Sequence, residues 1–501
     1  MLSLLPDFGG LKLRALEGLP AAQAVAGLDA VVVLLPIDGQ PDRRLPDAAR
    51  WRTLHAQASP RPGDVRCTVL ASGCTATLGY CRPDASTFQL LTVAGQMLRQ
   101  TLALSPQAQR IAVLAPGTAA HRGRGLEALL AATGAHAFSL PSAKAGKPGA
   151  KTPKHLERVE VYGGSGLDLR RSGAVADAGN LARHLTALPP NVLDARAYRR
   201  ALATLARRHG LTLRWYGEAA LKKLGAGAFL AVSRGNASRD AGIAHLSYRP
   251  RGRRAGPPDV ALVGKGILFD TGGTNLKPHR SMLDMHTDMA GSAVALSSLI
   301  ALARLKAPVA ADAWLAITEN AIGPKAYRPQ EVVRAANGTT IQVIHSDAEG
   351  RMVLADTLTL AARTEPGLIV DYATLTGACV YALTERMSGV FTNRESYVPA
   401  LVAAGQDSGE RVWHFPLYED FDSDIESSNA DVAQCAVEGK GDHILAARFL
   451  KRFVPDATPW VHLDLSSATR RGGLAHVPSE ITGFGVRYTL SLLLDQELPK
   501  K

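Results

Sequence analysis

The chain has 501 residues, of which 46% are hydrophobic and 20% are charged, and its formal net charge is +12 at pH 7. This composition is that of an ordinary globular protein, so disorder over most of the length is excluded, and the length predicts two domains. No stretch approaches the ~18 unbroken apolar residues of a membrane span, and we expect no membrane partner.

The first residues and the cysteines favour a cytoplasmic protein. The stretch MLSLLPDFGG is briefly apolar but lacks a basic start and a small-residue cleavage site. Five cysteines are few and odd in number, and their spacing fits neither a zinc ribbon nor a CxxC pair. They are Cys67, Cys74, Cys81, Cys379 and Cys435. We expect buried or free thiols in a reducing compartment.

The positive charge comes largely from arginines that are spread along the whole chain. The densest basic tracts, 141–154 and 249–258, are expected to be solvated loops. Nucleic-acid binding usually requires a concentrated basic patch. DNA binding is therefore the weaker interpretation of the charge, although it could coexist with another function.

Residues 1–165 predict a smaller α/β domain. The apolar runs 30–37, 65–72 and 110–116 are expected to be buried strands, and 86–104 has the i, i+3, i+4 spacing of a helix. Strands that alternate with helices predict a partly parallel sheet. The glycines of GTAAHRGRG (117–125) have the wrong spacing for a phosphate-binding Walker loop.

The Pro/Lys/Gly-rich segment 141–154 is predicted to be a linker, and residues 166–210 are predicted to form helices that lead into a larger domain. Within them, two helical patterns are broken at Pro189-Pro190, because proline removes a backbone donor and disfavours helix before it. Residues 211–501 predict the larger α/β domain. Its expected strands are 259–267, 311–319, 340–347, 367–375 and 460–466, and its expected helices are 288–306, 353–364, 396–405 and 444–452.

Three short segments of the larger domain place charged residues where the sequence is otherwise apolar. They are Lys265, Asp270 and Lys277 in 263–278, Asp288 in 282–305, and Asp347, Glu349 and Arg351 in 341–358. If residues 347–351 stay extended, their three charged side chains point to one face. Ligands of open α/β sheets bind at the carboxyl ends of strands, so we expect these segments to converge on one rim.

Four carboxylates at one rim would repel one another unless cations neutralise them. Hard oxygen ligands suit Mg²⁺, Mn²⁺ or Zn²⁺, and this many carboxylates is enough for a two-metal site. The alternative is that the acids are ordinary structural residues, with Asp288 a helix N-cap and Asp347 a turn residue. Spacing alone does not make Lys265 a ligand, because a protonated lysine has no lone pair to offer.

The segments VGKGILFDTGGTNLKP, MLDMHTDMAGSA, HSDAEGR and ATLTGA, in this order, resemble the signature of the leucyl aminopeptidase (cytosol aminopeptidase) family. The resemblance also covers 180–199, 319–333 and 462–468, and so spans about 175–490. It implies a smaller N-terminal α/β domain of macro-like type. It also implies a larger C-terminal catalytic α/β domain with a mixed central sheet flanked by helices.

The resemblance implies a role for each charged residue. One metal would be held by Asp270, Asp347 and Glu349, and the other by Lys265, Asp270, Asp288 and Glu349. Lys277 would polarise the substrate carbonyl, and Arg351 would hold a bicarbonate ion that acts as general base. The implied substrate-binding residues are Met285, Thr374, Leu375, Thr376, Gly377, Ser466 and Thr469.

This sequence departs from the family pattern at a few positions. His345-Ser346 stands where Asn-Thr is usual, and a histidine base at His345 or His286 stays open beside the bicarbonate. Ser466 and Thr469 stand where apolar residues often line the first side-chain pocket. Their hydroxyls predict a more polar pocket, so a preference for leucine does not follow.

The implied function is a metal-dependent aminopeptidase that uses a two-metal activated water to release N-terminal residues, leucine-type and others, from peptides. The implied cofactors are two divalent ions per subunit, Mn²⁺ or Zn²⁺ with Mg²⁺ as a further candidate, and the implied assembly is a homohexamer built as a dimer of trimers. A serine hydrolase is disfavoured because the chain has no GxSxG motif, and a dinucleotide-binding enzyme because Gly264-x-Gly266 is too short a match. The physiological metal, the preferred N-terminal residue, a dipeptidase-like specialisation and the role of the N-terminal domain stay open.

Overall fold

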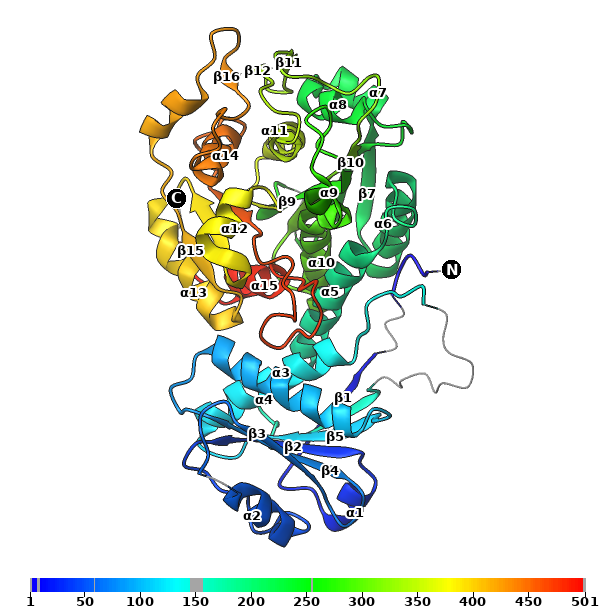
Figure 1. Cartoon of the computed structure of the whole chain (residues 1–501), viewed down its shortest axis with the longest axis vertical. Coiled ribbons are helices and arrows are strands. Elements are labelled where there is room, and N and C mark those ends of the chain that lie inside the picture. The colour runs from blue at the N-terminus through cyan, green and yellow to red at the C-terminus, as the bar shows by residue number, and fades with distance from the viewer. Residues whose placement is uncertain (1, 7–9, 58, 145–155, 254–255, 499–501) are drawn as a thin grey trace.

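The computed structural model describes residues 2–6, 10–57, 59–144, 156–253 and 256–498. The described chain forms two bodies stacked along its long axis, each built around its own sheet (Figure 1). The predicted class, two α/β units with a mixed sheet in the larger one, is confirmed. The domain boundaries at 165 and 210 stay predictions. Most of the predicted linker 141–154 lies outside the described residues.

The smaller body holds a six-stranded sheet in the order β1-β6-β5-β2-β4-β3, in which only the β3–β4 pair is antiparallel. Its strands are β1 (Lys12–Leu16), β2 (Ala30–Pro36), β3 (Val65–Val69), β4 (Thr75–Cys81), β5 (Arg110–Leu114) and β6 (Arg158–Tyr162). Its helices are α1 (Ala22–Ala26), α2 (Ala48–Ala56), α3 (Thr87–Leu104) and α4 (Ala119–His136). Helices α3 and α4 lie between this sheet and the larger body (Figure 1).

Two details of the smaller body differ from the sequence prediction. The strand predicted to be buried at 65–72 is β3, which is half-buried because it lies at the sheet edge with a single neighbour. Strands β1, β4 and β6 were not expected. The predicted helix at 86–104 is confirmed, and Ser86 and Gln89 form a capping box at its start. All five cysteines are free thiols, and four of them are buried.

The larger body holds an eight-stranded mixed sheet in the order β15-β14-β17-β13-β9-β10-β8-β7. Its strands are β7 (Thr212–Gly217), β8 (Gly242–Tyr248), β9 (Val260–Asp270), β10 (Ala311–Asn320), β13 (Leu368–Ala373), β14 (Ser388–Thr392), β15 (Val412–His414) and β17 (Trp460–Asp464). A small separate sheet contains β11 (Val332–Arg334), β12 (Thr340–Gln342) and β16 (Val432–Ala433). The central strands β13, β9 and β10 are parallel, so their carboxyl ends meet at one edge.

Helices cover both faces of the larger sheet. One face packs against α5 (Leu169–Ala187), α6 (Ala195–His209), α10 (Ala290–Leu305), α13 (Val398–Ser408) and α15 (Val486–Leu494). The other packs against α7 (Glu218–Lys223), α8 (Gly227–Ser233), α11 (Glu349–Ala362) and α14 (Asp442–Lys451). Two short helices, α9 (His279–Met282) and α12 (Gly377–Leu383), follow the carboxyl ends of β9 and β13. The break between α5 and α6 at Pro189-Pro190 is confirmed.

One helical segment, His279–Leu305, is long and apolar enough by length and composition alone to cross a membrane. In the structure, 89% of its most apolar window is buried within the protein. Its main helix, α10, packs against β9, β10 and β13 on one side and α5 on the other. The apolar composition of this helix is therefore explained by its place in the core.

Candidate metal centre and substrate cleft

Strand β9 places Lys265 and Asp270 at the carboxyl edge of the larger sheet. The strand lies between β10 and β13 and is covered on both faces, so the Lys265 side chain is only 4% exposed. The backbone of α10 lies against Gly264, where an added Cβ would be 2.5 Å from Ser292 Cα. This close approach fixes α10, and with it Asp288, beside Lys265.

The loop after β9 turns back so that Lys277 faces Asp270. Gly272 has φ +84°, a conformation that glycine adopts without steric cost, and its N–H donates to Asp270 Oδ1 at 2.8 Å. The N–H of Lys277 then donates to the Thr271 carbonyl at 2.9 Å. As a result, Lys277 Nζ lies 2.9 Å from Asp270 Oδ2 and 2.6 Å from Asp347 Oδ1.

The expectation of an extended segment from Asp347 to Arg351 is wrong. The strand predicted at 340–347 ends at Gln342 and belongs to the small sheet, and residues 345–348 form a turn. Glu349 and Arg351 lie in the first turn of α11, where positions two apart point in different directions by about 200°. Glu349 therefore faces the cluster, while Arg351 points to a different partner, Asp442.

The five predicted metal ligands nevertheless come together. Carboxylate oxygens of Asp270, Asp347 and Glu349 all lie within 4.8 Å of one another. Lys265 Nζ lies 2.7 Å from Asp288 Oδ1 and 3.0 Å from Glu349 Oε1. Four carboxylates thus face the two lysines, Lys265 and Lys277, and negative charge is in excess.

Burial and like charge both act on these acids. Burial raises the pKa of Glu349, and the neighbouring Asp270 carboxylate raises it further. Burial also raises the pKa of Asp288, against the opposing effect of Lys265. Burial by itself would lower the pKa of Lys265, but the attraction of Asp288 and Glu349 outweighs it, so the pKa of Lys265 is raised. Lys265 is thus held as a cation, whereas burial and like charge oppose ionisation of Glu349 and Asp288.

The chemistry of the donor set fits divalent cations. Asp288 Oδ2 is buried and has no hydrogen-bond partner among the described residues, although an unpaired buried carboxylate oxygen is costly. Asp288 is also not the N-cap of α10, because that position is Met289 and Asp288 Oδ1 accepts from Lys265 Nζ and Thr374 Oγ1. Excess buried carboxylate oxygens are the ligands that hard divalent ions prefer.

Asn320 was not predicted as a site residue, yet it positions two of the carboxylates. It ends β10 and is 1% exposed, and its Nδ2 lies 2.8 Å from Asp270 Oδ1, 3.1 Å from the Ser346 carbonyl and 3.3 Å from Glu349 Oε2. The rule that placed Asp270 at a strand end applies equally to Asn320, so the signal was present in the sequence.

A cavity of about 670 Å³ opens beside the cluster, and every predicted catalytic, metal-binding and substrate-binding residue lines it. The segment between β13 and α12 forms one wall. Asp464, which was not predicted, holds this wall by accepting from the N–H of Leu375 at 3.2 Å and from Thr376 Oγ1 at 2.6 Å. The cleft is therefore shaped by the ends of β9, β13 and β17 together.

The first side-chain pocket is less polar than the two hydroxyl residues, Ser466 and Thr469, predict. Ser466 Oγ donates to the Met387 carbonyl at 2.6 Å, so this hydroxyl is already used within the protein. Met285, in a short 3₁₀ helix (Met285–Thr287), and Thr469 line the same cavity. An apolar methionine and one Thr side chain thus contribute beside a serine whose hydroxyl is bound to the backbone.

The two histidines near the motifs differ in position. His345 lines the cavity and its Nδ1 accepts from the N–H of Asp347 at 3.2 Å, whereas His286 is not among the lining residues. Burial and then the charge of Lys277 lower the pKa of His345, and burial lowers the pKa of His286. Both side chains are therefore neutral imidazoles at pH 7.

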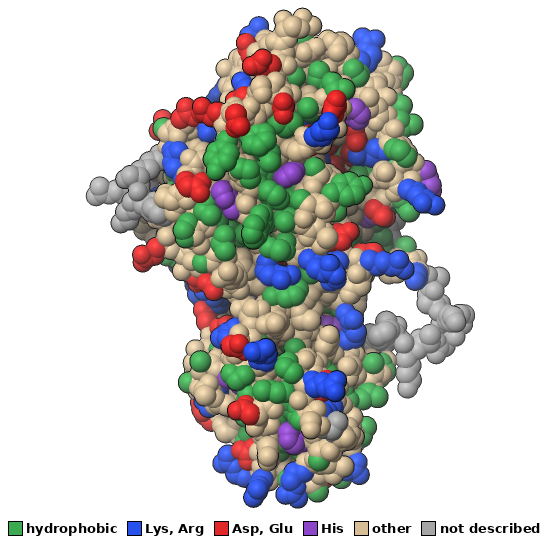
Figure 2. Space-filling view, turned by 60° about the vertical axis from the view of Figure 1, so that its left-hand side comes forward, with side chains coloured by type: hydrophobic (Ala, Val, Ile, Leu, Met, Phe, Trp, Pro, Cys, Tyr) green, Lys and Arg blue, Asp and Glu red, His purple; other side chains and the backbone are tan. Residues whose placement is uncertain are grey.

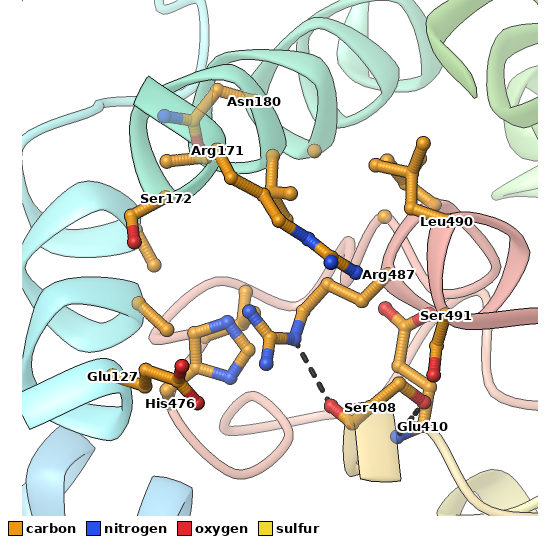
Figure 3. Close-up of a pocket in the computed structure, with 18 of the residues that line it drawn as sticks. Glu127, Arg171, Ser172, Asn180, Ser408, Glu410, His476, Arg487, Leu490 and Ser491 are labelled. Atoms are coloured by element: carbon orange, nitrogen blue, oxygen red, sulfur yellow. Dashed lines mark hydrogen bonds between the residues drawn. The ribbon is translucent and has the colours of Figure 1, made fainter. Parts of the chain in front are cut away.

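A second cavity, of about 550 Å³, lies between the two bodies and is lined by α4, α5, the end of α13 and α15. In Figure 3 the Arg487 side chain reaches into it, with Nε donating to the Ser408 carbonyl at 3.0 Å, and His476 and Glu127 lie opposite. Acidic and basic side chains are mixed in its wall. None of the predicted catalytic or metal-binding residues lines it.

Comparison with known proteins agrees with this geometry. The sequence model of the cytosol aminopeptidase family, catalytic domain, matches residues 180–490. A probable cytosol aminopeptidase of Acidovorax sp. (strain JS42) is 35% identical over 491 residues, which cover 95% of this chain and 94% of that protein. Another, of Syntrophotalea carbinolica, is 42% identical over 317 residues, but this match spans only 62% of each chain. Among solved structures, the bottromycin maturation enzyme BotP in complex with Mn has a TM-score of 0.77 and 31% identity, and the match covers 93% of this chain and 99% of that one.

Proposed function

Since the chain belongs to the cytosol aminopeptidase family, we propose that it is a metal-dependent aminopeptidase that removes N-terminal residues from peptides. The resemblance stated from the sequence is confirmed, and with it the assignment to this family of hydrolases. The observation that carries the proposal is the convergence of four carboxylates and two lysines from three separate segments beside one cavity.

We propose that this centre holds two divalent ions. Asp270, Asp347 and Glu349 would hold one, and Lys265 and Asp288 would join Asp270 and Glu349 at the other. The related structure that contains Mn supports a divalent metal, and makes Mn²⁺ the first candidate before Zn²⁺ and Mg²⁺. When bound, such ions supply Lewis acidity that activates water and polarises the scissile carbonyl. Lys265 can contribute a lone pair only as a neutral amine. Burial favours that form, and cations beside Asp288 and Glu349 would offset the attraction that otherwise raises the pKa of Lys265.

The residues of the chain would then divide the work. Lys277 is bound to carboxylates that the cations would neutralise, so its ammonium group becomes available to the carbonyl oxygen of the substrate. The free α-amine at the start of a peptide would bind this centre as a neutral lone-pair donor, which would account for removal of the first residue. Leu375 and Gly377 would bind the peptide backbone along the cleft wall. Bicarbonate at Arg351 stays a prediction of the resemblance.

The assembly and location are proposals of the same kind. Several large hydrophobic side chains of the larger body are exposed, among them Tyr381 at 93%, Trp413 at 58% and Tyr418 at 69%. Figure 2 shows hydrophobic side chains gathered over the middle of one face of this body. Exposed apolar surface of this kind marks protein contacts, which supports the homohexamer that the resemblance implies. Sedimentation of the purified chain as a monomer would contradict it. The cytoplasmic location rests on the resemblance and on the relatives named as cytosol aminopeptidases.

The test combines metal analysis with hydrolysis of a panel of aminoacyl p-nitroanilides and dipeptides, with and without added Mn²⁺. We expect up to two divalent ions per chain, activity that is lost with chelator and restored by metal, and no cleavage of N-acetylated substrates. The panel also ranks N-terminal residues, and cysteinylglycine in it tests the dipeptidase-like specialisation. A metal-loaded protein that cleaves none of the substrates would reject the proposed function.

A further inference from the structure

Arg351 is a buried cation whose hydrogen-bonding capacity is largely used by the chain itself. It is 2% exposed, its Nη2 donates to both carboxylate oxygens of Asp442 at 2.8 Å, and its Nη1 donates to the Gln434 carbonyl at 3.3 Å. Only Nε has no hydrogen-bond partner among the described residues. An arginine binds a free oxyanion firmly through two neighbouring N–H groups. Because Asp442 already accepts from Nη2, neither the Nη1–Nη2 pair nor the Nε–Nη2 pair is fully free for such an anion.

Asp442 lies in the substrate cleft as well as against Arg351. It is the first residue of α14, its side chain is 24% exposed, and it lines the same cavity as Lys277 and the metal-binding carboxylates. The N-terminus of a helix favours an ionised carboxylate. Arg351, which Asp442 faces, lies two positions after Glu349 in α11 and lines the same cavity. A fixed carboxylate is thus present close to the reacting centre.

We propose that Asp442 is the general base of the reaction, so that the chain supplies from its own sequence the carboxylate that the family resemblance assigns to bound bicarbonate. In this step an O–H bond of the attacking water breaks, its proton passes to Asp442, and the water oxygen forms a bond to the scissile carbonyl carbon. As the C–N bond then breaks, Asp442 returns the proton to the leaving amine. The inference rests on the proposed aminopeptidase function.

A purely structural role for the pair must be distinguished from this one, because Asp442 also fastens α14 to α11. The chain offers a matched control on the same helix. Arg448 of α14 pairs with Asp422 at 2.7 Å through both carboxylate oxygens, and the Asp422 side chain is 29% exposed. Neither residue lines the cavity. Loss of Asp422 removes an ion pair of similar geometry without removing a base.

The experiment uses the full metal-loaded chain in buffer freed of carbon dioxide. The wild type should change less than about twofold when bicarbonate is added, and Asp422→Ala should match it. Asp442→Ala should lose at least ~100-fold in kcat with little change in KM, the usual size of a general-base effect. Formate or bicarbonate should restore at least about tenfold, because the missing carboxylate leaves room for either. Asp442→Asn should lose as much without rescue, since its amide fills that space.

Binding provides a readout that does not depend on turnover. Calorimetric titration of bicarbonate into the zinc-loaded proteins should show binding by Asp442→Ala and none by the wild type or Asp442→Asn. Bicarbonate binding by the wild type, or kcat retained in Asp442→Ala, would overturn the inference. If the wild type cleaves no substrate at all, the proposed function fails, and the titration alone still decides whether Asp442 fills the anion position. Thermal melting of Asp442→Asn, which keeps the shape of the side chain, separates misfolding from loss of the base.

Discussion

The two sheets of this protein share an architecture but differ at the ends of their strands. In the smaller sheet the parallel strands β2, β4 and β5 end at Pro36, Cys81 and Leu114. In the larger sheet β9, β10 and β17 end at Asp270, Asn320 and Asp464, and all three belong to the carboxylate cluster or its cleft. The fold alone therefore does not specify chemistry, and the residues at the strand ends do.

Removing a metal-binding carboxylate is the most drastic way to test this difference. Glu349→Ala should lower kcat/KM by at least ~10⁴-fold, because the cluster loses the acid that faces both cation positions. Metal content, measured by mass spectrometry after dialysis, should fall with it. The control is Glu160→Gln, a buried acid of the smaller sheet that binds Tyr162. If Glu160→Gln lost metal equally, the contrast between the sheets would fail.

Lys277→Ala should have the next largest effect. Loss of the cation that stabilises the developing oxyanion should lower kcat by about 10²–10³-fold, in line with the ~3–4 kcal/mol reported for one such donor. Metal content should stay close to that of the wild type. Lys451→Ala removes a comparably buried lysine that pairs with Asp456 and does not line the cleft, so its kinetics should not change. Near-normal turnover of Lys277→Ala would reject its role.

Asn320→Ala tests whether a positioning residue at a strand end matters as much as a ligand. The amide donates to Asp270 and Glu349, so its loss should weaken metal affinity and activity by roughly 10–100-fold, as is usual for groups that orient ligands. Asn320→Asp would add a fifth acid in place of a donor and should weaken binding further. Titration of the metal-free variants with Mn²⁺ measures the change, and unaltered affinity in both would show that Asn320 is dispensable.

Glu410 provides the smallest effect and a contrast within the larger body, because this buried acid lies outside the carboxylate cluster and the charge of Arg487 only partly offsets its burial. Burial raises the pKa of Glu410 to about 7 from its usual value of 4.5, although the backbone N–H groups of Gly485 and Tyr488 donate to it. A raised pKa means that its contribution to stability is fully present below about pH 4.5 and is lost as the pH rises through about 7.

Relative to Glu410→Gln, the wild type should therefore lose on the order of 1–3 kcal/mol of its free energy of unfolding as the pH rises from 4.5 to 8. Denaturant titration at several pH values measures it, and the variant cancels the contribution of other groups. A pH-independent difference would show that Glu410 keeps an ordinary pKa in the folded chain.

Much of the site could be predicted because its residues follow a simple rule of chain geometry. Lys265 and Asp270 lie toward the carboxyl end of a parallel strand, and such ends gather at one edge. Asp347 joins them although the strand before it belongs to the small sheet. The prediction failed where a local pattern fits two structures. Charged residues at positions 347, 349 and 351 suit an extended chain, but Glu349 and Arg351 begin a helix whose apolar residues continue to Ala361.

Other residues escaped prediction because their partners are distant in sequence. Asp442 lies 91 positions from Arg351, and Asp464 lies 89 from Leu375, so no short motif contains either pair. The strand β4, TATLGYC, is fully buried although Thr and Gly interrupt its apolar residues, because its two neighbours and α3 cover it. Such burial follows from the assembled sheet and not from local hydrophobicity.

The first turn of α11 carries Glu349 on one side and Arg351 on another, with a single residue between them. A helix rotates by about 100° per residue, so one added or deleted residue between the two would swing one of them out of the cleft. Insertions in the preceding turn would instead displace both together. The relative orientation of the acid proposed to bind cations and the arginine that faces Asp442 thus depends on the single residue between them, and a redesigned enzyme has to keep that spacing.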